Sequence, residues 1–286
     1  MGKINNSFQH LRLSYSFILM PIFLFAVSQT NQPNWINVIV LFLILHLFVY
    51  PSNQAQAAFA NMQLAKCDIA AMQNHKSLFV ISTILDVIAM ALSVIISLKL
   101  SLFILTYLLV SKAYYSNPIR LKRYAMISLV LTMALQGAFL AALTQLAAGN
   151  VPIGSNIVML QACSFFVGFV LPLTQMYSHN IDGNRGDYTI SLRLGLNRTF
   201  TLSFVMLFIA VMFMGLHFYS TKSMFHFYLF LLFLSPIMAY FFWWKKNTKI
   251  QPLAASFQFT RLFVIITSAS MGLFSLVLIF LNHFNN

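Results

Sequence analysis

Long apolar runs separated by short polar segments alternate along the sequence. Nine runs can be marked, and most contain the ~17–25 residues that a membrane-spanning helix needs, although the first and fourth are short. The pattern predicts an all-α integral membrane protein with nine transmembrane helices. The approximate runs are Leu13 to Ser28, Asn34 to Tyr50, Leu78 to Leu98, Leu100 to Tyr115, Tyr124 to Ala148, Ile153 to Tyr177, Thr199 to Tyr219, Met224 to Trp244 and Phe259 to Phe280.

The composition excludes a water-soluble domain. Of the 286 residues, 60% are hydrophobic and 7% are charged, and the mean hydropathy is +0.82. Such a chain has more apolar surface than one core can cover. The two cysteines, Cys67 in a loop and Cys163 within a run, make no plausible disulfide or metal site.

The positions of the basic residues test the helix count, because Lys and Arg in short loops stay in the cytoplasm. With a cytoplasmic N-terminus, all but two of the 17 basic residues fall in inner loops, the exceptions being Lys99 and Lys222. We therefore expect the N-terminus inside, the C-terminus outside, and a multi-pass protein of the bacterial inner membrane. The inner residues are Lys3, Arg12, Lys66, Lys76, Lys112, Arg120, Lys122, Arg123, Arg185, Arg193, Arg198, Lys245, Lys246, Lys249 and Arg261.

These charges allow two other interpretations. A net charge of +13 would suggest a nucleic-acid partner for a soluble protein, but here it reflects the cytoplasmic bias and favours anionic lipid or diphosphate. The first run, with Lys3 and Arg12 ahead of it, also has features of a signal peptide. Its removal would leave eight spans and spoil the charge asymmetry, so we interpret it as a helix.

A polar segment, Pro172 to Phe200, contains two of the four carboxylates in the chain. If the preceding apolar run continues as a helix, Gln175, His179 and Asp182 lie at i, i+4 and i+7 and project from one face. Carboxylate and imidazole groups gathered at the end of an apolar helix suggest a site for metal, phosphate or both.

The same segment then gains glycine, a second aspartate and several cations. Gly183 and Gly186 are expected to break the helix, and Asp187 follows directly. The nearby cations are Arg185, Arg193 and Arg198.

This segment resembles the second aspartate-rich motif of the UbiA superfamily of intramembrane prenyltransferases, Q-x-x-x-H-x-x-D-x-x-x-G-D-x-T-x-x-x-x-L-G. The resemblance implies that residues 1–286 form one UbiA-like domain. It also implies transfer of an isoprenoid chain from a prenyl diphosphate to a lipophilic acceptor of aromatic or quinone type, with Mg²⁺ as the cofactor. The matching residues are Gln175, His179, Asp182, Gly186, Asp187, Thr189, Leu194 and Gly195.

The first motif of that superfamily, Asn-x-x-x-Asp-x-x-x-Asp, is altered here. It would begin at Asn53, but Ala57 and Asn61 occupy the two acidic positions. Diphosphates are usually held through hard cations that prefer carboxylate oxygens, so half of the expected metal cage is missing. We expect a single Mg²⁺ on Asp182 and Asp187, or Lys and Arg in its place.

The segment SKAYYSNPIRLKRY resembles the Tyr/Lys-bearing loop of the superfamily. Its functional interpretation is that Lys122 and Arg123 bind the diphosphate as it leaves; the alternative is ordinary positive-inside topology. Composition alone favours topology, whereas the motif around Asp182 favours the functional role for Lys122.

Asp86 lies in the middle of the third run. A carboxylate at that depth costs roughly 2.5–3.5 kcal/mol, so it should face the bundle interior, be protonated or find a partner. Acceptor binding and a hydrogen-bonded structural role both remain open.

Together these inferences define the expected site. Asp182, Asp187 and Lys122 are the expected catalytic residues, and the two aspartates are the expected metal ligands. The expected substrate contacts are Asn53, Arg123, Gln175, His179, Arg185 and Asp86.

Two rival functions remain in view. Loss of the first-motif carboxylates favours a catalytically inactive relative that binds prenyl lipid or acts as a scaffold. A transporter would carry charged residues near the midplane of several helices, and Asp86 alone fits that pattern. The sequence does not identify a protein partner.

Overall fold

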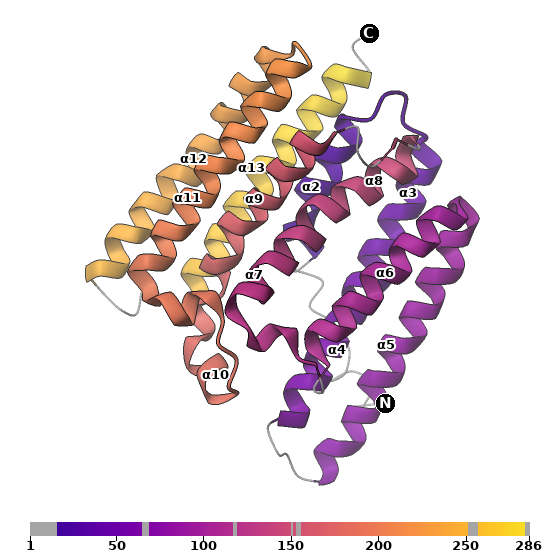
Figure 1. Ribbon diagram of the computed structural model, residues 1–286, viewed down its shortest axis with the longest axis vertical. Helices are drawn as coiled ribbons and strands as arrows, with labels where there is room; N and C mark the ends of the chain where they lie inside the picture. Colours follow the sequence, from indigo (N-terminus) through magenta and orange to yellow (C-terminus); the bar gives the residue numbers. More distant parts are fainter. Residues whose placement is uncertain are drawn as a thin grey trace. The chain divides into compact units, whose positions relative to one another are not determined.

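The structure, a computed structural model, describes residues 16–64, 69–116, 119–149, 151–152, 156–250 and 257–283. These parts of the chain are helical and contain no strand (Figure 1). The predictions for Lys3, Arg12, Lys66 and Cys67 fall outside the described residues.

The expectation of a multi-pass membrane protein is confirmed. By length and composition, eight helices of the described residues can cross a membrane. They are Trp35–Ala60, Ser77–Ile96, Leu98–Tyr115, Ala125–Gly149, Ile157–Ser178, Ile190–Ser220, Met224–Thr248 and Phe257–His283.

The first expected run is described only in part. Within helix α2 (Ser16–Ser28), the apolar segment Leu19–Ser28 is shorter than a full span. A ninth span and the sides on which the two termini lie therefore stay predictions.

The chain forms two compact units, which are described separately. The first contains residues 34–122, and the second contains residues 18–33 and 123–286.

In the first unit, Asn34 begins the helix α3 (Trp35–Leu43) because its side chain accepts hydrogen bonds from two backbone N–H groups of the first turn. A π-helical turn, η2 (Ile44–Val49), continues α3 into α4 (Tyr50–Leu64), so one long helix results. Ser97 ends α5 (Ile69–Ile96) and caps α6 (Leu98–Tyr115) by accepting from the Leu100 N–H at 3.1 Å. The helices α4, α5 and α6 pack against one another.

The second unit is built around α9 (Ile157–Thr174), which packs against α7 (Ala125–Met133) and α11 (Ile190–Ser220). Gly137 allows close approach, because a Cβ there would collide with the Ser164 backbone. The helices α12 (Met224–Ile250) and α13 (Phe257–His283) pack against each other, as Figure 1 shows. The remaining elements are η4 (Ala134–Phe139), α8 (Leu140–Gly149), η5 (Met176–Ser178) and α10 (His179–Asn184).

Aromatic side chains fill the core where α9, α11, α12 and α13 meet. Phe169 packs edge-on against Phe263 at 5.5 Å between ring centroids, and Phe200 packs edge-on against Trp244 at 5.3 Å. All four side chains are fully buried. Burial of such large apolar groups fixes the start of α11, which carries part of the polar segment.

Gly195 bends α11 near its beginning. Its φ of 73° and ψ of 170° lie outside the helical region, in a conformation that only glycine adopts readily. The bend separates the first turn, which follows Thr189, from the long apolar part of the helix.

We expect Gly195→Ala to lower the free energy of unfolding by about 1–3 kcal/mol, since alanine would be strained at this φ. Gly272→Ala in α13 is the matched control, because a Cβ there meets nothing within 4 Å and no positive φ is present. It should be neutral or stabilising by up to about 1 kcal/mol. Denaturant unfolding of both variants in detergent measures the difference, and equal effects would contradict the assigned strain.

Candidate functional site

The helix that carries the polar segment is interrupted, which corrects one sequence-based expectation. Helix α9 ends at Thr174, the turn η5 follows, and α10 begins at His179. Gln175 therefore lies at a break and not within a continuous helix. Gly183 lies inside α10, so it does not break the helix as expected.

Gly186 does end the helix, as expected. Its φ is 70°, and the chain reverses there so that the Asp187 N–H donates to the Asp182 carbonyl oxygen at 2.9 Å. The Arg185 N–H donates to the same oxygen at 3.1 Å. The turn thus brings the backbones of the two aspartates together.

Both aspartates are buried, with 4% of Asp182 and 1% of Asp187 exposed. The Ser178 hydroxyl donates to Asp182 Oδ2 at 2.6 Å, which orients that carboxylate. We call Ser178, Asp182 and Asp187 the acidic corner. Two buried carboxylates at the end of a span are costly unless a cation or hydrogen-bond donors offset their charge.

A chain of hydrogen bonds supports the acidic corner from α11. His179 Nε2 lies 2.7 Å from Ser191 Oγ, and the Ser191 N–H donates to Gln175 Oε1 at 3.5 Å. Ser191 Oγ lies 3.2 Å from Thr199 Oγ1, which donates to the Gly195 carbonyl oxygen at 2.7 Å. Gln175 and His179 are therefore brought together through Ser191.

Sequence reasoning missed Ser191 and Thr199. A signal was present, because the two residues are eight apart and share one helix face with Gly195 midway between them. This spacing was missed because the predicted membrane span begins only at Thr199, after Ser191.

Burial lowers the pKa of His179 from its ordinary value of 6.5, and the negative charge of Asp182 opposes this shift without cancelling it. The imidazole is therefore neutral near pH 7, with one nitrogen able to donate and the other able to accept. A neutral ring suits an orienting role between Ser191 and the rest of the segment.

The expected cations occupy different settings. Arg185 is half-buried beside the acidic corner in sequence, whereas Arg193 and Arg198 are exposed. Lys122 is half-buried in the 3₁₀ turn η3 (Leu121–Arg123), and Arg123 is exposed. Contact of Lys122 or Asn53 with the acidic corner stays a prediction, because both belong to the first unit.

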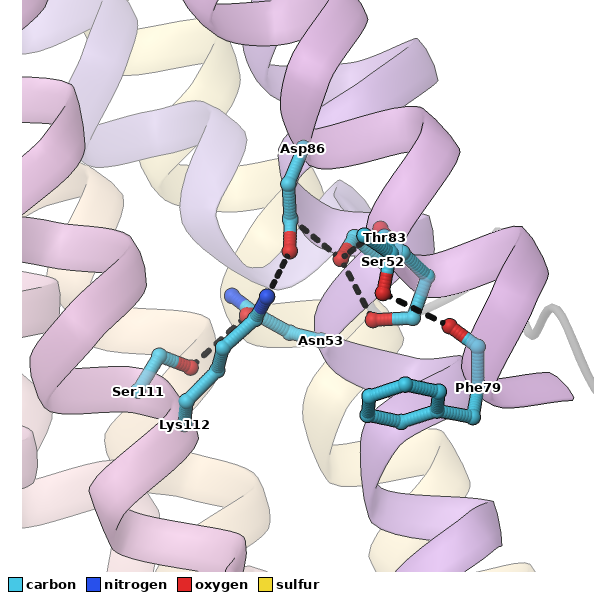
Figure 2. A network of polar contacts seen from close by, with 8 residues as sticks. Ser52, Asn53, Phe79, Thr83, Asp86, Ser111 and Lys112 are labelled. Atoms are coloured by element: carbon cyan, nitrogen blue, oxygen red, sulfur yellow. Dashed lines mark hydrogen bonds and ion pairs between the residues drawn. The ribbon is translucent and has the colours of Figure 1, made fainter.

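Asp86 has polar partners, as expected for a carboxylate in the middle of an apolar run. Lys112 Nζ lies 2.6 Å from Asp86 Oδ2, and the Ser52 hydroxyl donates to Asp86 Oδ1 at 2.5 Å. Ser52 Oγ also lies 3.0 Å from Ser82 Oγ. Figure 2 shows these side chains converging from α4, α5 and α6.

A separate hydrogen bond joins Asn53 of α4 to α6 next to these residues. The Ser111 hydroxyl donates to Asn53 Oδ1 at 2.7 Å, and Ser111 precedes Lys112 in α6 (Figure 2). We call Ser52, Asn53, Asp86, Ser111 and Lys112 the lysine network. Sequence reasoning had counted Lys112 only among the loop cations, so its inward ion pair is a new finding.

The donor sets decide where a metal ion fits. Among the described residues, no cluster of three or more His, Cys, Asp or Glu side chains exists. Mg²⁺ is usually held by one or two carboxylates plus water and substrate phosphates, which is what Asp182 and Asp187 offer. The residues present therefore fit one ion at the acidic corner.

Solved structures share this fold. A UbiA homologue from Archaeoglobus fulgidus bound to DMAPP and Mg²⁺ matches with a TM-score of 0.68 and 15% sequence identity, over 96% of this chain and 98% of that chain. The structure of a UbiA homologue from the same organism bound to GPP and Mg²⁺ gives 0.65 and 16%, over 96% and 99% of the two chains. A digeranylgeranylglyceryl phosphate synthase gives 0.62 and 14%, over 98% and 99%.

No family model matches the chain, and no curated protein matches it. At identities near 15%, the matches establish architecture and leave chemistry to the side chains. The chain has the fold of the UbiA homologues, as the resemblance in the polar segment implies.

We expect Lys112→Met to lower the free energy of unfolding by about 2–3 kcal/mol, because Asp86 would remain buried without its cation. The double variant Asp86→Asn/Lys112→Met removes both charges and should recover most of that loss. Unfolding of the wild type and both variants in detergent measures the coupling. A double variant no more stable than Lys112→Met would contradict a compensated ion pair.

His179 makes stability depend on pH. The unfolded chain binds a proton near pH 6.5, whereas the folded chain binds it only at lower pH, so stability should fall as pH drops below about 6.5. The slope due to one group stays below about 1.4 kcal/mol per pH unit. Thermal unfolding from pH 7.5 to 5 should show a weaker dependence for His179→Gln than for the wild type, and identical profiles would contradict the lowered pKa.

Proposed function

We propose that the protein is an intramembrane prenyltransferase that moves an isoprenoid chain from a prenyl diphosphate to a lipophilic acceptor of aromatic or quinone type. The observation that carries this proposal is the acidic corner, in which two buried aspartates joined by a backbone hydrogen bond lie in one turn after an apolar span. The solved structures of the same fold support it, because two of them hold DMAPP or GPP together with Mg²⁺.

The reaction breaks the bond between the allylic carbon and the diphosphate oxygen. A bond then forms between that carbon and the acceptor, which loses a proton, and the diphosphate leaves with the bonding electrons. The barrier falls when positive groups offset the negative charge that grows on the diphosphate. A bound Mg²⁺ supplies such charge as a Lewis acid.

The residues of this chain hold and orient the ionic end of the substrate. Asp182 and Asp187 would hold the metal ion, and Ser178 fixes the rotation of the Asp182 carboxylate through its 2.6 Å hydrogen bond. Arg185 lies in the same turn as Asp182, and its guanidinium is proposed to contact diphosphate oxygens. Lys122 and Arg123 are proposed to add charge from the loop before α7.

Gln175 and His179 are proposed to act as positioning residues for this diphosphate site. They bind Ser191 rather than the aspartates in the hydrogen bonds described above, and so tie the end of α9 to the start of α11. This connection holds the turn that contains the acidic corner. Their loss should weaken substrate binding without removing a metal ligand.

The allylic carbon carries positive charge when the diphosphate leaves and must be kept from water. Helices of the second unit provide an apolar surrounding rich in phenylalanine, and aromatic faces attract cations. Asp86 was a candidate for acceptor binding. Because both of its oxygens are engaged by Ser52 and Lys112, a supporting role within the lysine network is the better proposal.

The second candidate function is an inactive prenyl-lipid-binding or scaffold protein. The observation in its favour is the first motif, where Ala57 and Asn61 replace the carboxylates that the resemblance implies. The retained acidic corner favours the enzyme. A metal-dependent affinity for diphosphate is the property that separates the two.

The test is titration of the purified protein in detergent with geranyl diphosphate, with and without Mg²⁺. We expect Mg²⁺ to strengthen binding, and Asp182→Asn to weaken the Mg²⁺-dependent binding at least about tenfold, the loss typical of disturbing a metal site. Asn184→Ala, an exposed carboxamide two residues away, is the matched control and should bind like the wild type. Binding that ignores both Mg²⁺ and Asp182→Asn would refute the enzyme proposal and leave the scaffold.

A further inference from the structure

The lysine network has an unusual balance of donors and acceptors. Asp86 Oδ1 accepts from Ser52, Asp86 Oδ2 forms an ion pair with Lys112, and Asn53 Oδ1 accepts from Ser111. The acceptors of this network are therefore occupied. Any group that binds next to it meets hydrogen-bond donors.

Two groups supply those donors. The Lys112 ammonium has three N–H bonds, and its nitrogen lies 2.6 Å from Asp86 Oδ2. With its oxygen turned to Ser111, the Asn53 carboxamide presents its NH₂ group (Figure 2). Donors of this kind suit an anion and not a metal ion.

Lys112 also points in an unexpected direction. Asp86 and Lys112 lie on either side of the turn at Ser97, on α5 and α6. Lys112 is four residues further from this turn than Asp86, which corresponds to roughly 6 Å along the helix axis. The lysine therefore reaches back into the span. A lysine near the end of a membrane helix ordinarily extends outward to the interface.

The two side chains of the ion pair differ in exposure. The Asp86 side chain is 8% exposed, whereas 36% of the Lys112 side chain is exposed. Asp86 thus anchors the lysine from the buried side and raises the cost of turning it away. The Lys112 ammonium group is thereby held in place and can donate further hydrogen bonds.

The position of this cation matters because Asn53 begins the altered first motif. Where the resemblance implies carboxylates, Ala57 and Asn61 stand, and neither can hold a hard metal ion as a carboxylate does. The structure instead places an ammonium group in the network that includes Asn53.

We propose that Lys112, held by Asp86, forms with Asn53 a metal-independent site for a phosphate group, and that this site binds the diphosphate of the substrate. The identity of the anion rests on the proposed function. In the first unit, the ammonium group of Lys112 supplies the positive charge that a second metal ion would supply. Mg²⁺ is then required at the acidic corner alone.

The test is calorimetric titration of the whole protein in detergent with geranyl diphosphate and, separately, inorganic pyrophosphate, each in EDTA and in Mg²⁺. The key variant is Asp86→Asn/Lys112→Met, which leaves no unpaired buried charge. We expect it to weaken binding in EDTA at least about tenfold, as loss of a charge-assisted hydrogen bond implies. Lys112→Arg, which keeps the charge, should retain most of the affinity.

Lys99→Met is the matched control, since Lys99 is an exposed lysine on the same helix. It should bind like the wild type. The EDTA affinity of the wild type should also fall as salt rises, and the double variant should lose this dependence. Equal affinities of wild type and double variant in EDTA would overturn the proposal.

The outcomes separate this inference from the proposed function. Binding of geranyl diphosphate that needs Mg²⁺ and Asp182 but ignores Lys112 would refute the lysine site and keep the enzyme. Binding of pyrophosphate through Lys112 without any effect of Mg²⁺ or Asp182 would keep the lysine site and refute the enzyme. In nanodiscs, displacement of the diphosphate by phosphatidylglycerol but not by phosphatidylcholine would assign the site to a lipid headgroup and overturn the substrate assignment.

Discussion

The cost of burying charge in apolar surroundings organises this protein. All three described carboxylates are buried, and their settings fall into two kinds. Asp86 is neutralised by Lys112 within the protein. Asp182 and Asp187 instead sit in one tight turn, where Ser178 and backbone hydrogen bonds hold them close together. A carboxylate neutralised by lysine supports structure, whereas we propose that the two carboxylates of one turn hold a cation.

This contrast connects fold and function. The UbiA fold supplies apolar helices whose ends carry polar segments, and likeness of fold at about 15% identity does not specify the chemistry. In the second unit, the break after Thr174 and the turn at Gly186 place the two aspartates in one turn. In the first unit, the lysine network offers donors. We infer two complementary ways of holding a diphosphate, one through a metal ion and the other through an ammonium group.

The sequence predicted the features that depend on local pattern. Eight apolar runs became long helices, and the glycine at 186 ended a helix as expected. Prediction from the sequence failed where the outcome depended on contacts between residues distant in the chain. Gly183 stayed helical, and the ion pair of Lys112 with Asp86 joins residues 26 apart, which no spacing rule reveals. The role of Ser191 was missed for the same reason, since its partners are Gln175, at the break after α9, and His179 on α10.

The most direct measurement is an experimental structure, by cryo-electron microscopy, of the protein with geranyl diphosphate and Mn²⁺, whose density is easily recognised. We predict one metal ion, bound by Asp182 and Asp187 and by a diphosphate oxygen. Two metal ions with one of them beside Asn53, or a diphosphate bound away from the aspartates, would contradict this prediction.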